Sequence, residues 1–162
     1  MISTTRLDLL PLQTEHAAEM AEVLADPALH AFTGGTPLSR EALLARYRRL
    51  AAGSPDPAVR WLNWVIRLRD EDRLTGTVQA TITQADESAE IAWVVGTPWQ
   101  GRGIAREAAR GLVTWLATQP VRTVIAHVHP GHHASAAVAT SAGLAATDEV
   151  HDGETRWLLR FP

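Results

Sequence analysis

Residues 91–105 read IAWVVGTPWQGRGIA, and this stretch joins an apolar run typical of a strand to the start of a helix-like run. Gly101 and Gly103 stand one residue apart at the junction. Glycines let the backbone approach a ligand with no Cβ in the way, and the first N–H groups of a helix lack intrahelical acceptors. The pattern therefore predicts an anion site for a phosphate or pyrophosphate.

Two familiar phosphate-binding patterns do not fit this junction. A dinucleotide-binding fingerprint needs Gly or Ala where the chain has Arg106, and a carboxylate about twenty residues further on, near Thr123, where there is none. A P-loop needs Gly-Lys followed by Ser or Thr, and the stretch has no lysine. Both classes of nucleotide site are excluded.

The remaining pattern is Gln/Arg-x-x-Gly-x-Gly/Ala, represented here by Gln100, Gly103 and Ala105. It resembles the acyl-CoA loop of the GCN5-related N-acetyltransferase (GNAT) superfamily. Upstream, residues 90–95 are similar to that family's fourth strand. Downstream, residues 129–144 resemble its closing Asn-x-x-Ser...Gly-Phe motif, which reads His-His-Ala-Ser at 132–135 and Gly-Leu at 143–144.

The resemblance covers nearly the whole chain. Residues 5–12 are similar to the first strand of the subgroup that includes the ribosomal-protein N-terminal acetyltransferases. The family implies an α+β fold with a mixed, mostly antiparallel central sheet of about seven strands and about four helices. It also implies that the fourth and fifth strands splay apart.

Composition sets limits on the class of protein. A chain of 162 residues, 46% hydrophobic, is long enough for one domain over residues 1–162 and too short for two ordinary ones. The net charge of −3 argues against general nucleic-acid binding, and the lack of cysteine excludes a cysteine acyl-enzyme. Without a leader or a long apolar run, we expect a cytoplasmic protein with no membrane segment.

The order of elements follows from hydrophobic spacing and from turn residues. Apolar periodicity and caps predict helices that begin near Thr14, after Ser39, at residue 104 and near residue 134. Residues 61–68, 74–83 and 90–95 are expected to form an antiparallel meander. Further strands are expected over residues 7–12 and 121–128, and as a final pair around a turn at residues 151–153.

Acetyl transfer to an amine requires loss of a proton, because an alkyl amine with a pKa of about 10 is mostly protonated at neutral pH. Glu90 stands where the family often has a carboxylate base. The alternative is an outward-facing strand residue that only improves solubility. Alternation places Glu90, Ala92 and Val94 on one face of the strand, but the resemblance implies a bulge that would break this alternation.

The resemblance also implies the donor site. The backbones of Val94 and Val95 would pair with pantetheine like an added strand, and an N–H near Val95 would stabilise charge on the thioester carbonyl oxygen. The CoA diphosphate would lie on the loop formed by Gln100, Gly101, Arg102, Gly103, Ile104 and Ala105. Arg102, and less strongly Arg106, could neutralise phosphate; the alternative is a pair of solvated cations.

The usual general acid of the family is missing. The position of its common Tyr, seven residues after the motif's Asn, is Ala139 in this chain, and that Asn is replaced by His132. The resemblance implies that Ser135 hydrogen-bonds the CoA sulfur, with His132 as a further donor toward CoA. The alternative for Ser135 is a helix-terminus serine that satisfies backbone N–H groups.

The acceptor site is predicted less sharply. Trp64 and Trp93, with Trp61, could wall an acceptor pocket, or could be core or interface anchors. His127 could line the same site. His127, His129, His132 and His133 also raise the alternative of a metal site, but there is no clear fourth ligand, and we expect no metal.

The sequence thus predicts an acetyl-CoA-dependent N-acetyltransferase that works by direct attack in a ternary complex. The acceptor would be a small-molecule amine (amino acid, antibiotic or polyamine) or a protein N-terminus. The missing Tyr and the Asn-to-His change leave the alternative of a non-catalytic acyl-CoA-binding or partner-binding module. A homodimer is compatible with the family, although no residue pattern predicts it.

Overall fold

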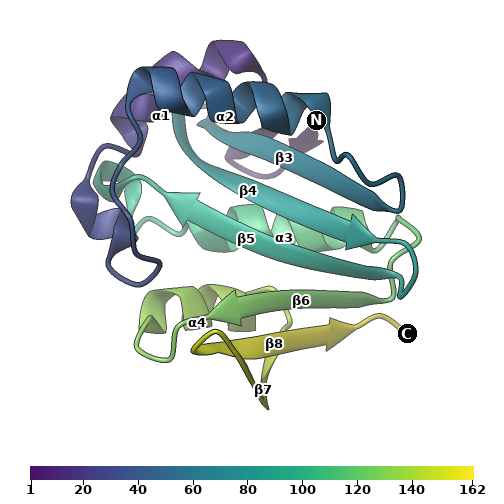
Figure 1. Cartoon of the computed structure of the whole chain (residues 1–162). Helices are drawn as coiled ribbons and strands as arrows, with labels where there is room; N and C mark the ends of the chain where they lie inside the picture. Colours follow the sequence, from purple (N-terminus) through teal and green to yellow (C-terminus); the bar gives the residue numbers. More distant parts are fainter.

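The computed structural model describes residues 1–162 and contains one sheet of eight strands in the order β1-β2-β3-β4-β5-β6-β8-β7 (Figure 1). The strands are β1 (Ile2–Ser3), β2 (Leu7–Pro11), β3 (Val59–Leu68), β4 (Arg73–Thr83), β5 (Ser88–Val95), β6 (Thr123–Val128), β7 (Ala145–His151) and β8 (Glu154–Arg160). Every neighbouring pair is antiparallel except β5 and β6. The predicted α+β class is confirmed, and the short strand β1 brings the count above seven.

Four α-helices lie on the two faces of this sheet: α1 (Ala17–Val23), α2 (Arg40–Ala52), α3 (Ile104–Leu116) and α4 (His133–Ser141). Figure 1 shows α2 on the near face beside β3, whereas α3 lies behind β4 and β5. Three short 3₁₀ turns complete the described elements: Thr14–His16, Pro27–His30 and Thr97–Trp99. No helix combines the length and the apolar composition of a membrane span.

The cap residue and the apolar spacing found in the sequence account for the start of α2 and for the position of α3. Ser39 Oγ accepts a hydrogen bond from Ala42 N at 3.1 Å, which caps α2 as expected. The four positions of α3 at spacing four are all buried, and they seat the helix on the sheet: Ile104, Ala108, Leu112 and Leu116. The start of α3 is therefore held at the end of β5.

The splay of the two central strands is present. β5 pairs with β6 only at its start, where Ser88, Ala89 and Glu90 face Thr123, Val124 and Ile125. Residues 91–95 continue with β4 as their only partner strand. A gap therefore opens between β5 and β6 on the side where β5 leads into the glycine-containing loop.

The bulge expected in the strand of Glu90 is not found. The pairing of β5 with β4 runs from Ser88 to Val95 without a shift of register. The register shift lies one strand away, between Ile66 and Arg67 of β3, where the buried Thr75 of β4 has no Cα partner and its Oγ1 donates to Ile66 O at 3.2 Å. Alternation along β5 is therefore unbroken, and Glu90 lies on the same face as Ala92 and Val94.

Candidate functional site

The loop before α3 presents a row of free backbone donors. Gly101 and Gly103 have φ values of 76° and 77°, in the left-handed region that glycine adopts without strain. No protein group accepts a hydrogen bond from the backbone N–H of any residue between Gly101 and Arg106, and the first such donor is Glu107 N, to Gly103 O at 3.1 Å. Consecutive unpaired N–H groups at a helix start form a site for an anion.

Gln100 connects this loop to the strand that precedes it. Its side-chain Nε2 donates to Val95 O at 3.0 Å, and its backbone N donates to Thr97 O at 3.2 Å. Both contacts are internal to the protein. Gln100 therefore fixes the path of the chain from β5 into the loop.

Arg102 is held by a carboxylate from the turn between β3 and β4. Its Nη2 lies 2.7 Å from Glu71 Oε1, while Glu71 Oε2 accepts from Trp99 Nε1 at 3.1 Å. The hydrogen bond from Arg102, followed by that from Trp99, lowers the pKa of the Glu71 carboxyl. Arg6 adds a third support, since its Nη1 donates to Arg102 O at 3.0 Å.

The backbone facing the gap belongs to alternate residues of β5. Gly96 N donates to Thr75 O of β4 at 2.8 Å, so the pattern of an antiparallel ladder directs the N–H and C=O of Val95 away from β4. Val95 O is taken by Gln100, which leaves Val95 N–H toward the gap. By the same alternation the backbone groups of Val94 belong to the ladder with β4, so the expectation that Val94 supplies free groups is wrong.

Glu90 and His127 meet on the face that carries α2. The Glu90 carboxylate Oε1 lies 2.7 Å from His127 Nδ1 across the parallel strands β5 and β6. The Glu90 side chain is 55% exposed, whereas that of His127 is 16% exposed. The pair is thus open to a molecule that approaches this face, and the carboxylate is the more exposed of the two groups.

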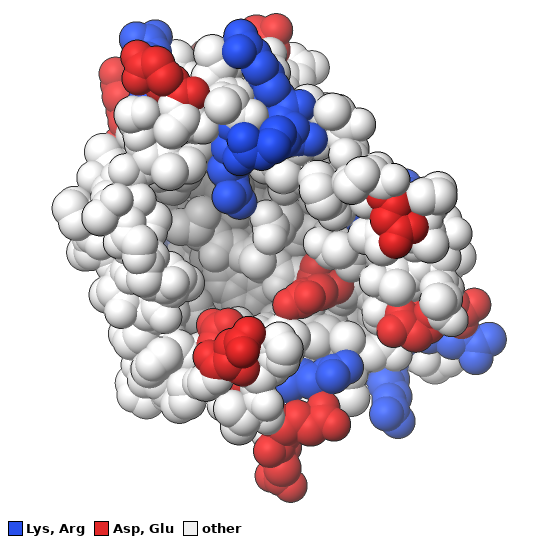
Figure 2. Space-filling model, viewed as in Figure 1, with Lys and Arg blue, Asp and Glu red and all other residues white.

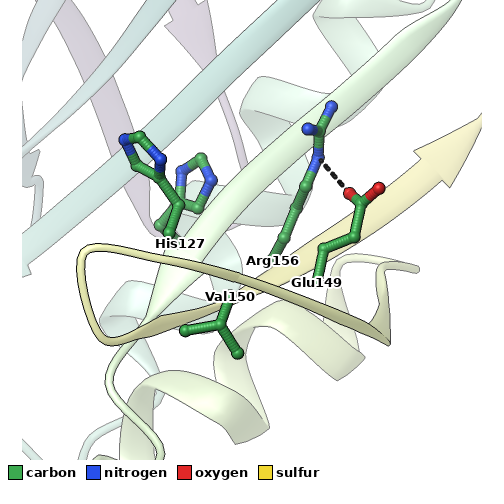
Figure 3. Close-up of a pocket in the computed structure, with 5 residues that line it drawn as sticks. His127, Glu149, Val150 and Arg156 are labelled. Atoms are coloured by element: carbon green, nitrogen blue, oxygen red, sulfur yellow. Dashed lines mark ion pairs between the residues drawn. The ribbon is translucent and has the colours of Figure 1, made fainter.

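A pocket of about 420 Å³ opens beside His127. Figure 3 shows its lining from β6 and the β7–β8 hairpin, with the Arg156 guanidinium directed at Glu149. Arg156 Nε lies 3.4 Å from Glu149 Oε2, and the His127 and His151 rings are 5.4 Å apart. The sequence places acceptor-selecting residues near His151 but does not single out Glu149, Val150 or Arg156.

A second cluster lies on the opposite face, beside the gap. Trp93 Nε1 donates to Ser135 Oγ of α4 at 3.3 Å, and the same oxygen is 3.5 Å from His132 Nε2. The His132 ring stacks on Phe32 with centroids 4.4 Å apart. Burial, with a contribution from His129, lowers the pKa of His132, so its ring is neutral at pH 7.

Two predicted acceptor residues do not lie with Glu90. Trp64 is 6% exposed and packs edge-on against Trp115 of α3, and the register Trp64–Val78–Trp93 places Trp93 on that same face. The expectation that Trp64 and Trp93 wall the acceptor pocket is therefore wrong. Trp61, paired with Thr81 and through it with Glu90, lies on the face of Glu90 instead.

Three of the four histidines have different hydrogen-bond partners, although the rings of His129 and His132 both lie against Phe32. His127 contacts Glu90, His132 contacts Phe32 and Ser135, and His129 Nδ1 accepts from Gly131 N at 3.0 Å. No three His, Asp or Glu side chains are grouped in a way that could hold a metal ion. Ala139, at the position of the family's usual Tyr, is fully buried in the core.

Comparison with solved structures finds the same fold with low sequence identity. A GNAT-family acetyltransferase from Bacillus anthracis superposes with a TM-score of 0.81 at 16% identity, covering 98% of this chain and 97% of that one. The microcin C7 self-immunity acetyltransferase MccE, in complex with acetyl-CoA and AMP, gives 0.81 at 14% identity, with 98% and 94% covered. RimL, a ribosomal L7/L12 alpha-N-protein acetyltransferase in complex with coenzyme A, gives 0.80 at 17% identity, with 97% and 95% covered.

Comparison of the sequence with curated proteins finds no match. Comparison with protein-family models is more specific: the model of the acetyltransferase (GNAT) domain matches residues 6–145, which include the strand β5, the glycine-containing loop and the segment of Ser135. The chain therefore belongs to the GNAT family of acetyl-CoA-dependent N-acetyltransferases.

Proposed function

We propose that this protein moves an acetyl group from acetyl-CoA directly to a primary amine, in a complex that holds both substrates at once. The observation that carries the proposal is the row of unpaired N–H groups between Gly101 and Arg106 at the start of α3. A diphosphate needs several donors at once, and a helix N-terminus adds a favourable dipole. Structures of MccE and RimL hold acetyl-CoA or CoA on the same fold, which supports this donor.

The gap between β5 and β6 is suited to the extended pantetheine arm. Residues 91–95 have a strand partner on one side only, so the arm can pair along the other side. Val95 N–H is directed to this gap, where it can pair with the pantetheine arm. The N–H of Trp93 is directed to the gap by the same alternation and lies nearer to Glu90, where a backbone donor would stabilise the negative charge that develops on the thioester oxygen. Acceptor amine and thioester would then meet beside Glu90 and His127.

The Glu90–His127 pair removes the proton that the amine loses. The ammonium first gives up a proton to Glu90 or, through the contact of 2.7 Å, to His127. The neutral amine nitrogen then bonds to the thioester carbonyl carbon, the carbon–sulfur bond breaks, and a second proton of the nitrogen ends on the sulfur of CoA. A base must lie within hydrogen-bond reach of the amine, directly or through one water. The exposed Glu90 carboxylate is accessible to an amine on this face, which supports this role.

Ser135 stabilises the departing thiolate in place of the absent Tyr. Trp93 donates to Ser135 Oγ, so the hydroxyl proton of Ser135 is free to point elsewhere. Donation to the CoA sulfur would stabilise the thiolate through a charge-assisted hydrogen bond. His132, neutral at pH 7, is near enough to exchange a proton with the same hydroxyl.

Replacing Ser135 by Ala should lower kcat about tenfold or more, because a hydrogen bond to a charged group contributes ~1.5–3 kcal/mol. The KM for acetyl-CoA should change little. Steady-state thiol release measures both constants. Ser141→Ala is the matched control, since that hydroxyl donates to Val138 O at 2.8 Å at the far end of α4. An unchanged kcat in Ser135→Ala would remove Ser135 from the reaction.

Replacing Glu71 by Gln should weaken acetyl-CoA binding by up to about fivefold, because an exposed ion pair such as Arg102–Glu71 contributes ~0.2–1 kcal/mol. The loop would lose the side chain that holds Arg102 and Trp99. Calorimetry with acetyl-CoA gives the dissociation constant. Asp70→Asn, in the same turn, should leave it unchanged, and equal effects of the two changes would show that the Glu71 contact is not specific.

The experiment that tests the proposed function is an acetyl-CoA turnover screen over amino acids, polyamines, aminoglycosides and N-terminal peptides. CoA release and the mass of the acceptor are both followed. We expect at least one acceptor to gain one acetyl group with equimolar release of CoA. Binding of acetyl-CoA without release of CoA by any acceptor would contradict catalysis and favour a binding module.

A further inference from the structure

A groove of about 180 Å³ lies between α2 and the strands β3 and β4, on the face of the sheet that carries Glu90. Its lining comes from one helix and two strands: Arg46 and Leu50 of α2; Trp61, Leu62 and Asn63 of β3; and Gln79, Ala80 and Thr81 of β4. Figure 2 shows that this face of the molecule is hollowed below α2. The groove has neutral polar and aromatic walls and a single charged side chain, Arg46.

The groove lies next to the Glu90–His127 pair on the same face of the sheet. Trp61 pairs with Thr81, and Thr81 pairs with Glu90, so the three residues form one row across β3, β4 and β5. Neighbouring strands are ~4.8 Å apart, so the near wall of the groove at Thr81 is one strand from Glu90, and the far wall at Trp61 is two strands, or about 10 Å, from it. A molecule with its amine at Glu90 could reach under α2 without leaving the face.

The charge on the groove is not neutralised within the protein. Several arginines of the strands and turns form ion pairs with carboxylates, among them Arg67, Arg73, Arg102 and Arg156. The arginines of α2 form none: Arg40, Arg46, Arg48 and Arg49. The sequence contains no lysine, so the basic side chains that gather over α2 in Figure 2 are arginines.

We infer that the acceptor is an amine that carries a carboxylate about 10 Å from its nitrogen, with the carboxylate bound by Arg46 at the groove and the amine at Glu90. This inference rests on the proposed function. At ~3.3–3.6 Å per extended residue, a peptide N-terminus with an acidic side chain at its second or third position has this span. A long ω-amino carboxylic acid has the same chemistry.

The chain offers a matched control on the same helix. Residues of an α-helix are separated by 100°, so Arg46 and Leu50 share a flank, and Arg48, two positions from Arg46, lies on the other side. Arg48 is exposed and is not part of the groove. Arg48→Glu therefore changes the net charge of the protein by the same amount as Arg46→Glu without changing the groove.

The test is competitive acetylation of two amidated tripeptides that begin with Ala and end with Glu or Arg, read by mass spectrometry for the wild type, Arg46→Glu and Arg48→Glu. A long ω-amino carboxylic acid and the matching alkyl amine are compared in parallel to separate a peptide acceptor from a small molecule. In each pair whose acidic member is acetylated, the wild type and Arg48→Glu should acetylate that member about tenfold faster than its partner. Arg46→Glu should abolish or reverse that preference.

Each other outcome contradicts the inference in a distinct way. Acetylation of acidic and basic acceptors at equal rates, or equal effects of Arg46→Glu and Arg48→Glu, would show that the groove does not read a carboxylate, while the enzyme activity stands. Absence of acetylation of every acceptor, with CoA still bound, would contradict the proposed function and with it this inference.

Discussion

Glu90→Gln is expected to lower kcat/KM for acetyl transfer by about 10²–10⁴-fold, the usual contribution of a positioned general base. The amide cannot take a proton at neutral pH, but it has the size of the carboxylate and can still contact His127. Binding of acetyl-CoA should therefore be unchanged, because the loop of Gly101–Arg106 lies at the other end of β5. Steady-state measurement of thiol release gives kcat/KM for acetyl transfer, and calorimetry gives the affinity for acetyl-CoA.

Two further variants make this result specific. Glu87→Gln is the control, because Glu87 lies just before β5 and pairs with Arg122 rather than with His127. His127→Gln should lower the rate as well, and the double variant should be little worse than either single one, since residues that act as a unit give non-additive effects. A Glu90→Gln enzyme with an undiminished rate would exclude the pair as the base.

Gly103→Val should weaken acetyl-CoA binding about tenfold or more. A non-glycine residue with positive φ costs ~1–2 kcal/mol, and a β-branched side chain is worse. The backbone can relieve that strain only by rotating the N–H groups that flank residue 103 out of their row. A Cβ at this position would also lie 3.4 Å from Arg6 Nη2, the group that supports the loop.

Gly53→Val separates strain from binding. Gly53 follows α2 with a φ of 86°, and a Cβ there would meet no atom within 4 Å. The strain should lower the melting temperature of both variants, whereas only Gly103→Val should lose affinity in calorimetry. If both variants bind acetyl-CoA as the wild type does, the conformation at Gly103 does not matter for the donor.

Several parts of the molecule follow from local sequence signals. The glycines of the loop, the spacing of Ile104, Ala108, Leu112 and Leu116, and the Ser39 cap each depend on neighbours within one or two turns, and the structure has each as expected. The hairpin turn is similarly local, because Asp152 and Gly153 both have positive φ. Such features are fixed by chain geometry and require no knowledge of the tertiary fold.

The remaining parts depend on register and on partners distant in sequence. The contact of Glu90 with His127 requires the alignment of two parallel strands, which no local pattern specifies. The supports of the loop, Arg6 and Glu71, come from the first turn of the chain and from a surface turn, where charged residues are usual. The placement of the tryptophans, in contrast, follows from local sequence. Trp61 and Trp64 are three residues apart in one strand, so alternation alone puts them on opposite faces of the sheet.

A crystal structure of the protein with CoA bound tests most directly whether the loop before α3 binds the diphosphate. We expect diphosphate oxygens about 2.7–3.2 Å from the backbone nitrogens between Gly101 and Arg106, with the pantetheine arm between β5 and β6. A complex in which the diphosphate lies on another part of the surface, with these N–H groups facing only water, would contradict this expectation.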